Sequence, residues 1–421
     1  MSHPSSNCCD SSPKQKLNNL DEVIKRLTGH ADSLISLGNH TESVPLNIAL
    51  NRVLAEDISS HIDVPPADNS AVDGYALATD DFSGSEPIPV SQRIPAGHAP
   101  SALTPGTAAR IFTGASVPDN ADCVIMQEQA IFDESSQSVR FDTRVKPQQN
   151  IRPKGQDIQQ GQVILKKGQI LSPQRLGLVA SIGTDFIRVY RPLKVAIFST
   201  GDELVEPGDT PKTGQIFNSN RYLLTGLLQN LKFEVIDLGV IPDQLEATLT
   251  ALERAAESAD VVLTTGGASV GEEDYIQAAI KSLGTIDFWR VAIKPGKPFM
   301  YGEINQTPVL GLPGNPGAVF VTFSVLARPF LLHAQGITGT TPKAYPHRLD
   351  FDIKKAGPRR EFLRVQINES GLLTQHPNQS SGMLSSASWA EGFAVIPEHT
   401  QPKAGEIVNF IPFSNLFSLT N

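Results

Sequence analysis

VVLTTGGASVGEEDY, residues 261–275, carries the strongest structural signal in this sequence. The apolar run Val261–Leu263 predicts a buried strand. Gly266 and Gly267 predict a turn whose backbone N–H groups can approach a ligand with no Cβ atom in the way. A helix is predicted to begin near Glu272, and the N-terminus of a helix favours an anion. The same turn carries three consecutive carboxylates, so a phosphate bound here requires a cation such as Mg²⁺ between the two.

Length and composition set the broad class of protein. The chain of 421 residues has room for about three domains. Its content of 40% apolar and 19% charged residues is typical of a soluble globular protein. The formal net charge of −9 argues against a nucleic-acid partner, which needs an extended basic surface. Three cysteines give no disulfide framework and indicate a reducing compartment, which we take to be the cytoplasm.

No segment of the sequence predicts export or membrane insertion. The N-terminal stretch MSHPSSNCCDSSPK has no apolar core of the signal-peptide kind, and its adjacent cysteines have no context for lipid anchoring. The longest apolar run, Ala318–Leu332, contains Arg328 and Pro329 and is too short to cross a bilayer. We therefore expect a buried helix at that run and no membrane partner.

Changes of texture along the chain predict its division into domains. Residues 1–16 are polar and are expected to be disordered. A helix is predicted from a cap at Asn19 to Gly29, and a second short helical pattern follows Pro45. The predicted domains are a discontinuous elongated domain (17–60 and 149–190), a β-rich insert (61–148), an α/β domain (191–336) and a C-terminal β-domain (337–421).

The α/β segment alternates strand-like and helical patterns, which is the signature of a mostly parallel sheet with helices on both faces. The expected strands are Val195–Phe198, Val235–Leu238, Val261–Leu263, Phe288–Val291 and Val309–Leu312. The expected helices are Arg221–Leu231, Gln244–Ala256, Tyr275–Leu283 and Ala318–Leu332. Ligands of such folds bind at the carboxyl ends of the strands, so we expect the functional residues there.

Unusual polar residues lie at the predicted strand ends. Asp202 and Glu203 in STGDEL either cap the next segment or join the acidic turn in one crevice, where a divalent cation would offset their repulsion. Lys294 and Lys297 flank a Pro-Gly turn that is either simply solvated or grips an oxyanion. No P-loop, dinucleotide fingerprint, nucleophile elbow or His/Cys metal cluster is present in the sequence. These residues indicate a multidomain enzyme that acts on a phosphate or phosphoanhydride with Mg²⁺.

Seven separated motifs, taken together and in their order, make the chain resemble a known family. From the N-terminus they are DNSAVDGYA, RIFTGASVP, NIRPKGQDI, STGDEL, TTGGASVGEEDY, KPGKPFMYG and GLPGNPGAV. The family is that of the molybdopterin molybdenumtransferases, the bacterial MoeA type and the E domain of gephyrin-like proteins. The resemblance extends from near Leu17 to the C-terminus.

This resemblance implies an activity, a fold and partners. The family inserts molybdate into adenylylated molybdopterin and releases AMP, with a divalent cation, usually Mg²⁺. Its fold combines an elongated discontinuous domain, a β-rich insert, an α/β domain like that of the molybdopterin adenylyltransferases, and a C-terminal β-barrel. It forms homodimers in which the insert of one subunit completes the cleft between the α/β and C-terminal domains of the other. The implied further partners are the molybdopterin adenylyltransferase and apo-molybdoenzymes.

The functional positions of the family transfer onto matching residues of this sequence. Catalytic positions match Glu203, Asp243, Asp274, Lys294, Lys297, Thr113 and Asp68. Glu203 and Asp274 are the implied metal ligands. Positions that bind the pterin, its phosphates or an oxyanion match Gly266, Gly267, Ser269, Pro313, Pro316, Asn69, Ser70, Asp73, Asp157, Arg364 and Ser381. The arginines at 359–364 fall where the family places oxyanion-binding groups.

The sequence departs from the family pattern at three positions, and two other functions stay open. Ala67 stands where a bulky aromatic is common, Val72 where Met is common, and Gln156 removes a charge beside Asp157. One alternative is adenylyl transfer to molybdopterin, against which the insert and the C-terminal domain argue. The other is a non-catalytic scaffold of the gephyrin kind, against which the intact acidic and lysine positions argue.

Overall fold

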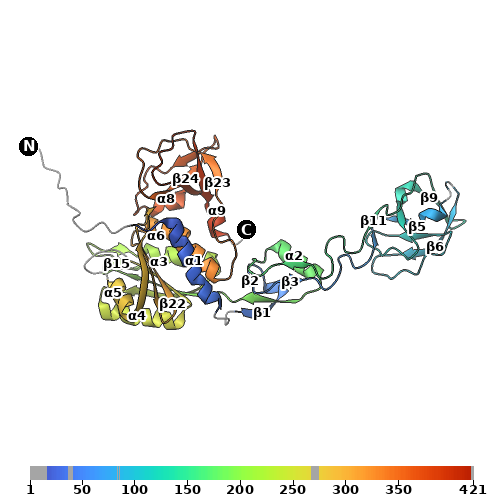
Figure 1. Ribbon diagram of the computed structural model, residues 1–421. Helices are drawn as coiled ribbons and strands as arrows, with labels where there is room; N and C mark the ends of the chain where they lie inside the picture. Colours follow the sequence, from blue (N-terminus) through green and yellow to red (C-terminus); the bar gives the residue numbers. More distant parts are fainter. Residues whose placement is uncertain (1–16, 37–40, 83, 85, 267–274, 419–421) are drawn as a thin grey trace, which may run out of the picture.

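The computed structural model describes residues 17–36, 41–82, 84, 86–266 and 275–418. The molecule is elongated (Figure 1). An α/β domain and the C-terminal domain form a body at one end, a small β-domain lies in the middle, and a β-rich insert lies at the far end. The chain passes through the middle domain on its way to the insert and again on its way back.

The α/β domain is built on a six-stranded mixed sheet with the order β17-β14-β18-β22-β21-β19. Its parallel strands are β14 (Lys194–Thr200), β17 (Glu234–Ile241), β18 (Val261–Thr265) and β22 (Thr307–Leu312). The three inner ones, β14, β18 and β22, are rich in buried apolar residues, as expected for a sheet covered on both faces, whereas the edge strand β17 is only partly buried. The two remaining strands, β21 (Pro298–Ile304) and β19 (Gly284–Arg290), are antiparallel. The strand expected at Phe288–Val291 is therefore the end of the edge strand β19. It is antiparallel because it pairs with β21, a strand that the sequence did not predict.

Helices cover both faces of this sheet. On the face that carries Val195, Val261 and Leu310 lie α3 (Ser219–Asn230), α6 (Pro316–Thr322), a π-helical turn (Phe323–Ala327) and α7 (Arg328–Ala334). On the opposite face lie α4 (Leu245–Ser258) and α5 (Tyr275–Leu283). Within the described part of the chain, one continuous helical stretch, Pro316–Ala334, has the length and hydropathy of a membrane span. It is a core helix of this domain, since 94% of its apolar window is buried inside the protein.

Helix α1 (Leu20–Ser36) belongs to the same body. The side-chain oxygen of Asn19 accepts hydrogen bonds from the N–H groups of Asp21 and Glu22 at 2.9 and 3.3 Å, so the predicted cap is present. The helix runs past Gly29, where the sequence predicted its end, because Ala31 and Leu34 continue the apolar face into the core. Its packing against α7 places residues 20–36 with the α/β domain rather than with the elongated domain to which we assigned them.

The middle domain is made from two stretches of the chain that share one core. Its strands are β1 (Thr41–Pro45), β2 (Val53–Leu54), β3 (Ile58–Ser59), β12 (Val163–Leu165) and β13 (Phe186–Tyr190). They pair in the order β1-β13-β2 and β12-β3, and α2 (Pro173–Ser181) follows a cap at Ser172. The helical pattern predicted after Pro45 forms only the 3₁₀ turn Leu46–Ile48, because Val53 and Leu54 pair with β13 instead.

The insert is a six-stranded sheet of order β8-β5-β7-β6-β10-β9 with an apolar cluster on each face. The strands of this sheet lie within the segment 61–148, which the sequence predicts to be β-rich. They are β5 (Gly74–Leu77), β6 (Ile88–Ile94), β7 (Ala108–Ile111), β8 (Cys123–Met126), β9 (Ala130–Asp133) and β10 (Ser138–Phe141). A two-stranded ladder of β4 (Asn69–Ser70) and β11 (Ile151–Arg152) lies where the chain enters and leaves the insert.

The C-terminal domain is a β-structure whose strand pairing nearly closes on itself. Its strands are β23 (Tyr345–Arg348), β24 (Arg360–Ile367), β25 (Leu373–Gln375), β26 (Gly392–Ile396) and β27 (Ile407–Pro412). The pairing β25-β24-β26-β27-β23 is completed by one bridge between Leu349 and Leu373 around an apolar core. Two short helices, α8 (Leu384–Trp389) and α9 (Phe413–Phe417), pack on this domain.

Candidate functional site

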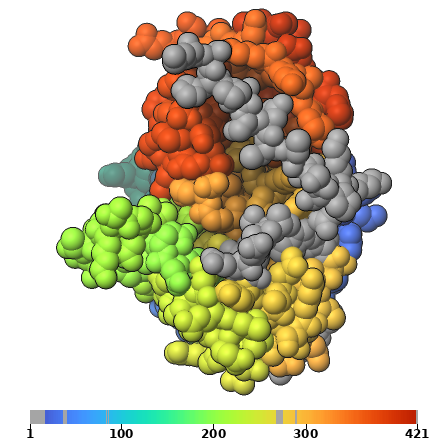
Figure 2. Space-filling view, turned by 90° about the vertical axis from the view of Figure 1, so that its left-hand side faces the viewer, coloured from blue at the N-terminus to red at the C-terminus, as the bar shows by residue number. Residues whose placement is uncertain are grey.

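A cleft between the α/β and C-terminal domains collects many of the predicted site residues. Figure 2 looks onto the face where these two domains meet, with the α/β domain in yellow and the C-terminal domain in red. The cleft has a volume of about 770 Å³, a size suited to a small organic ligand. Its described lining includes Glu203, Gly266, Lys294, Lys297, Pro313, Pro316 and Ser381.

Bare backbone forms part of the cleft lining at the ends of two neighbouring parallel strands. β14 ends at Thr200 and β18 at Thr265, and both residues line the cleft. Gly266 follows with φ +85°, and a Cβ atom there would lie 2.6 Å from the carbonyl oxygen of Thr200, so only glycine fits. Gly314 lies close by, since a Cβ on it would come within 3.9 Å of the Gly266 Cα. A ligand can therefore approach the main chain closely here.

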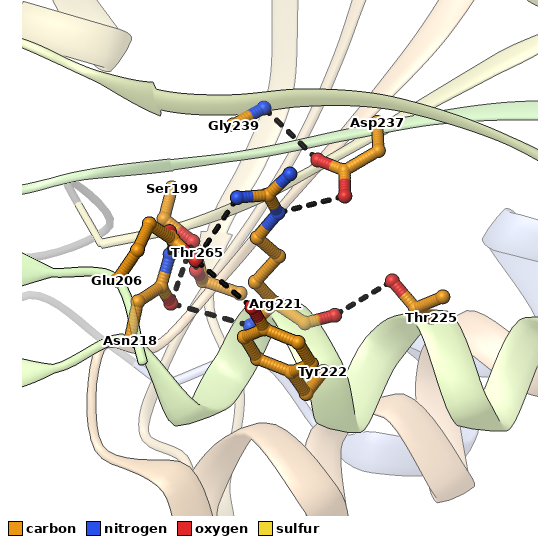
Figure 3. Close-up of polar contacts among 9 residues, drawn as sticks. All are labelled: Ser199, Glu206, Asn218, Arg221, Tyr222, Thr225, Asp237, Gly239 and Thr265. Carbon is orange, nitrogen blue, oxygen red and sulfur yellow. Dashed lines mark hydrogen bonds and ion pairs between the residues drawn. The ribbon is translucent and has the colours of Figure 1, made fainter. Parts of the chain in front are cut away.

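A buried polar network holds these strand ends in place (Figure 3). Asn218 caps α3 by accepting the N–H of Arg221 at 3.3 Å, and it also accepts the hydroxyl of Ser199 at 3.3 Å. The hydroxyls of Ser199 and Thr265 lie 2.8 Å apart. Asn218, Ser199 and Thr265 are all buried. Their hydrogen bonds therefore fix β14, β18 and the start of α3 relative to one another.

An ion-pair network continues from α3 to a small lobe beside the cleft, which is formed by the paired strands β15 (Leu204–Val205) and β16 (Ile216–Phe217). Arg221 pairs with Glu206 at 3.0 Å and with Asp237 at 2.7 Å. Glu206 follows the short strand β15 (Leu204–Val205), and Asp237 lies on β17. Hydrogen bonding to Asp237, and then to Glu206, outweighs desolvation and raises the pKa of Arg221. The lobe is thus tied to both α3 and the edge of the sheet.

Basic side chains outnumber carboxylates along the described lining of the cleft. Lys294, Lys297 and Arg359 line it, whereas Glu203 is the one carboxylate among the described lining residues. The ammonium of Lys294 pairs with Glu361 at 2.7 Å. Lys297 is exposed and forms no ion pair with any residue in the described ranges. This excess of positive charge favours an anionic ligand in a protein whose net charge is negative.

The lysine turn reaches the cleft by a route that differs from the expected one. We expected it at the carboxyl end of a strand of the α/β sheet. Instead, β20 (Ile293–Lys294) pairs in parallel with β24 of the C-terminal domain. The turn therefore spans the junction between the two domains, and Lys294 is held on the C-terminal side of the cleft.

The loop 379–382 closes the cleft from the C-terminal domain. The side-chain amide of Asn315 donates to the hydroxyl of Ser381 at 3.2 Å, and the N–H of Ala318 donates to the Ser381 carbonyl at 3.1 Å. Gly317 permits this contact, because a Cβ atom there would lie 2.8 Å from the same carbonyl. The start of α6 and the loop therefore meet in direct backbone contact.

The surroundings of Arg364 do not suit the oxyanion-binding role that we expected for this residue. Its side chain is only 1% exposed and does not appear in the cleft lining. The guanidinium donates to the carbonyl of Ser380 and the hydroxyl of Ser386, each at 3.1 Å, and burial lowers its pKa to about 10. The side chain of Gln379 bonds both backbone groups of Arg364, at 3.0 and 2.9 Å. Arg364 thus holds the loop 379–382 from behind, whereas Arg359 faces the cleft.

Of the predicted acidic residues that the structure describes in the α/β domain, Glu203 lines the cleft and Asp243 does not. Glu203 lies in the cleft, on the turn between β14 and β15. Asp243 does not line it. Its carboxylate accepts the N–H of Asp202 at 3.3 Å, and its own N–H donates to the Asp202 carboxylate at 3.2 Å. This reciprocal pair braces the turn that carries Glu203. Among the residues that the structure describes, no cluster of three or more His, Cys, Asp or Glu side chains could hold a metal ion.

The predicted insert residues gather at a second place, far from the cleft of the same chain (Figure 1). The carboxylate of Asp73 accepts the backbone N–H and the hydroxyl of Thr113 at 2.8 and 2.7 Å, which lowers the pKa of Asp73. Asp68 accepts the N–H of Lys154 at 2.8 Å. Ser70 is fully buried and donates to the carbonyl of Val72.

Two further predicted residues lie near this group. Asn69 is on β4, and its side-chain oxygen is buried with no hydrogen-bond partner among the described atoms. Asp157 is exposed, and its N–H donates to Val64 at 2.9 Å on the connection toward the middle domain.

Three predicted site residues lie outside the described ranges, and some residues that line the cleft were not predicted from the sequence. Gly267, Ser269 and Asp274 fall outside the described residues. The run Asn218–Asn220 lines the cleft but was not singled out. Asn220 is 8% exposed, and its amide donates to the carbonyl of Gly314 at 2.7 Å. The available signal was the pair of asparagines just before the helical pattern, since asparagine is a favoured helix cap.

Family models match nearly the whole chain in three successive parts. The MoeA N-terminal region (domain I and II) matches residues 18–183, a probable molybdopterin binding domain matches 196–333, and the MoeA C-terminal region (domain IV) matches 346–413. The cleft lies between the second and third of these parts. The fold is therefore that of the MoeA class of proteins.

Similar proteins of known name narrow this class to one family. A molybdopterin molybdenumtransferase of Haemophilus influenzae is 41% identical over 383 residues, which cover 89% of this chain and 95% of that protein. One from a Nostoc species is 36% identical over 372 residues, 85% of each chain. The crystal structure of a molybdopterin biosynthesis MoeA protein from Pyrococcus horikoshii has a TM-score of 0.81 at 33% identity and covers 94% of this chain and 100% of its own. The chain belongs to the molybdopterin molybdenumtransferases, an enzyme family of molybdenum cofactor biosynthesis.

Proposed function

We propose that this enzyme inserts molybdate into adenylylated molybdopterin, with release of AMP, in the cleft between its α/β and C-terminal domains. The observation that carries the proposal is the convergence of Glu203, Gly266, Lys297 and Ser381 from four separate segments on one cleft. Cleavage of a phosphoanhydride needs charge neutralisation and positioning more than a covalent nucleophile. The cleft offers those two contributions.

The basic residues bind the oxyanions of both substrates in this proposal. Lys297 and Arg359 contact phosphate or molybdate oxygens, and the Ser381 hydroxyl donates a hydrogen bond to one of them. Glu361 holds the ammonium of Lys294 at 2.7 Å, so that this cation has a fixed position before the substrate arrives. The backbone at Gly266 approaches the phosphates closely because no side chain intervenes.

A divalent cation fits this cleft together with the substrate rather than with the protein alone. Mg²⁺ is commonly held by one or two carboxylates plus phosphate oxygens and water. Glu203 is the described residue that would hold it, and Asp274, which is outside the described ranges, is the second ligand that we propose. The bound cation would supply charge neutralisation at the phosphoanhydride.

We also propose that two copies of the chain form a homodimer with a shared cleft. The insert, which carries Asp68 and Thr113, lies far from the α/β and C-terminal domains of its own chain (Figure 1), so a partner subunit is needed to bring these residues to a cleft. The middle domain exposes Ile48 and Leu50, in and after the turn that follows β1, and Phe186, at the start of β13, at 61%, 47% and 56%. Exposed apolar side chains of this kind mark protein interfaces. The molybdopterin adenylyltransferase and apo-molybdoenzymes are the further partners that we propose.

The direct test follows AMP release from adenylylated molybdopterin in the presence of molybdate and Mg²⁺. We expect release that depends on both. Production of adenylylated molybdopterin and pyrophosphate from molybdopterin and ATP would instead identify an adenylyltransferase. No turnover of either kind would indicate a scaffold.

A lysine variant ties the activity to this cleft. Lys297→Met removes a cation that faces the ligand, so we expect kcat/KM to fall about 100-fold or more. Lys194→Met is the matched control, because Lys194 begins β14 at the end of the strand remote from the cleft. It loses only an exposed ion pair with Glu234 at 3.8 Å and is expected to keep full activity. Equal activity of both variants would refute the assignment of the cleft.

A further inference from the structure

The lobe beside the cleft presents an aromatic ring that the oxyanion chemistry does not use. Phe217 ends β16 (Ile216–Phe217), lines the cleft and is 48% exposed. Its neighbour Ile216 also lines the cleft and is 58% exposed. Removing this exposed apolar surface from water lowers the free energy. In a concave site, a small ligand is what covers such a surface.

The backbone that carries this ring is fixed on both sides. The N–H of Ile216 donates to the backbone carbonyl of Glu203 at 2.8 Å, and the N–H of Asn218 donates to the backbone carbonyl of Val205 at 2.9 Å. Val205 and Phe217 are paired in the parallel ladder of β15 and β16. Asn218, the next residue, is 1% exposed and caps α3.

The lobe is also anchored at its base through Glu206 (Figure 3). The carboxylate of Glu206 pairs with Arg221 at 3.0 Å and accepts the hydroxyl of Tyr222 at 3.2 Å and the side-chain amide of Asn218 at 3.3 Å. Because the backbone is held in this way, only the rotamers of the Phe217 side chain lose conformational entropy when a ligand contacts the ring. The structure therefore holds Phe217 ready at the cleft before any ligand arrives.

We propose that Phe217 is a specificity-determining residue whose ring stacks on a flat nitrogen heterocycle of the substrate. This inference rests on the proposed function, whose substrate carries two such rings, a pterin and an adenine. The phosphates between those rings lie at the lysines, which line the same cleft. Stacking suits this position because an aromatic ring and a heterocycle attract one another face to face without a matched pattern of hydrogen bonds.

The surroundings of Phe217 favour a small molecule over a protein partner. Both exposed side chains of β16 line the cavity that also contains Gly266 and Lys297. A protein surface would have to enter a recess of about 770 Å³ to cover them. A planar ligand reaches the ring without that requirement.

The test measures the affinity of the full-length protein for AMP and for molybdopterin in two separate binding assays. Phe217→Ala removes the ring, so we expect the Kd of one of the two ligands to rise about 10- to 100-fold. Phe217→Tyr keeps the ring and is expected to bind within about twofold of the wild type. Phe217→Leu keeps apolar bulk without an aromatic face and should fall between the two. The ligand that loses affinity identifies the ring that stacks.

Two outcomes would overturn the inference. One is unchanged affinity of Phe217→Ala for both ligands. The other is an effect on subunit or protein association without an effect on either Kd, which would assign the ring to docking. Circular dichroism and thermal unfolding check that the variants fold, which we expect because the side chain is half exposed. Failure of the proposed function is recognised separately, as absence of molybdate-dependent AMP release by the wild type.

Discussion

Arg359 and Arg364 belong to the same segment of the C-terminal domain but have different surroundings. Arg364 is 1% exposed and donates to oxygens of Ser380 and Ser386. Arg359 lines the cleft, where its guanidinium donates one long hydrogen bond of 3.4 Å to the Ile293 carbonyl. A buried cation that satisfies protein oxygens stabilises the fold, whereas a cation that faces a cleft is available to a ligand.

The first prediction separates these two arginines by what they affect. Arg364→Met leaves the Ser380 carbonyl and the Ser386 hydroxyl without their donor, so we expect the free energy of unfolding to fall by about 2–4 kcal/mol. Arg359→Met is expected to change it by less than about 0.5 kcal/mol and to raise the KM for molybdate instead. Urea unfolding and steady-state kinetics measure the two effects. The opposite pattern would show that Arg364, not Arg359, meets the substrate.

At the scale of elements, a salt bridge between distant parts of the chain joins α1 to the C-terminal domain. Arg360 on β24 donates to both oxygens of Asp21 at 2.7 and 2.9 Å. These hydrogen bonds, together with the positive charge of Arg360, lower the pKa of Asp21 against the opposing effect of burial. The ionised form of Asp21 is therefore the one that binds α1 to this domain.

The second prediction concerns how this contact depends on pH. A carboxyl group whose pKa is lowered in the folded protein stabilises it above the unfolded pKa of about 3.9, and this stabilisation disappears as the pH falls through the lowered value. Asp21→Asn should therefore be less stable than the wild type at pH 7, by about 0.5–1 kcal/mol because the side chain is largely exposed. The difference should shrink below about pH 4.

Chemical unfolding at a series of pH values measures this difference. Glu22→Gln is the matched control, since Glu22 is the neighbouring acidic residue and forms no ion pair with any described residue. The control loses only the general effect of a carboxylate in the first turn of α1, so Asp21→Asn should lose more stability than the control at pH 7. A constant difference between Asp21→Asn and the wild type down to acid would mean that the stabilisation does not come from ionised Asp21.

Local sequence patterns predicted elements well where local preferences and tertiary packing agree. Helix α5 ends at Leu283, as predicted, because its apolar periodicity ends there. Prediction failed where packing decides the outcome. Helix α1 continues through Gly29 because its apolar face lies in a core built from distant residues. Val53 and Leu54 form a strand because β13 offers them partners.

The same division applies to the candidate site. Glu203 and Gly266 could be placed together from sequence because the carboxyl ends of neighbouring parallel strands meet at one edge of the sheet. The pairing of Lys294 with the C-terminal sheet depends on contacts that no local pattern encodes. Burial of Arg364 was missed for a similar reason, because a charged residue in a strand gives no sequence signal of being inside.

At the scale of the whole molecule, the elongated shape separates two groups of residues that the family resemblance joins. The cleft with Lys297 lies in the body, and Asp68 and Thr113 lie in the insert at the far end (Figure 1). A rigid chain of this shape cannot bring its own insert to its own cleft. A second subunit arranged by a twofold axis can exchange inserts, so that each cleft contains residues of both chains.

The last prediction tests that exchange by mixing two inactive variants. Lys297→Met damages the cleft, and Asp68→Asn damages the insert. If the cleft is shared, a mixed dimer has one cleft with both changes and one with neither. Equal amounts of the two variants, allowed to exchange subunits, should then recover about a quarter of wild-type AMP release, because half of the dimers are mixed and each has one intact cleft. Phe186→Asp in both chains places charge on the exposed apolar face of the middle domain and should prevent this recovery by blocking dimer formation. A mixture that forms mixed dimers by mass spectrometry and stays as inactive as its parents would mean that each cleft is complete within one chain.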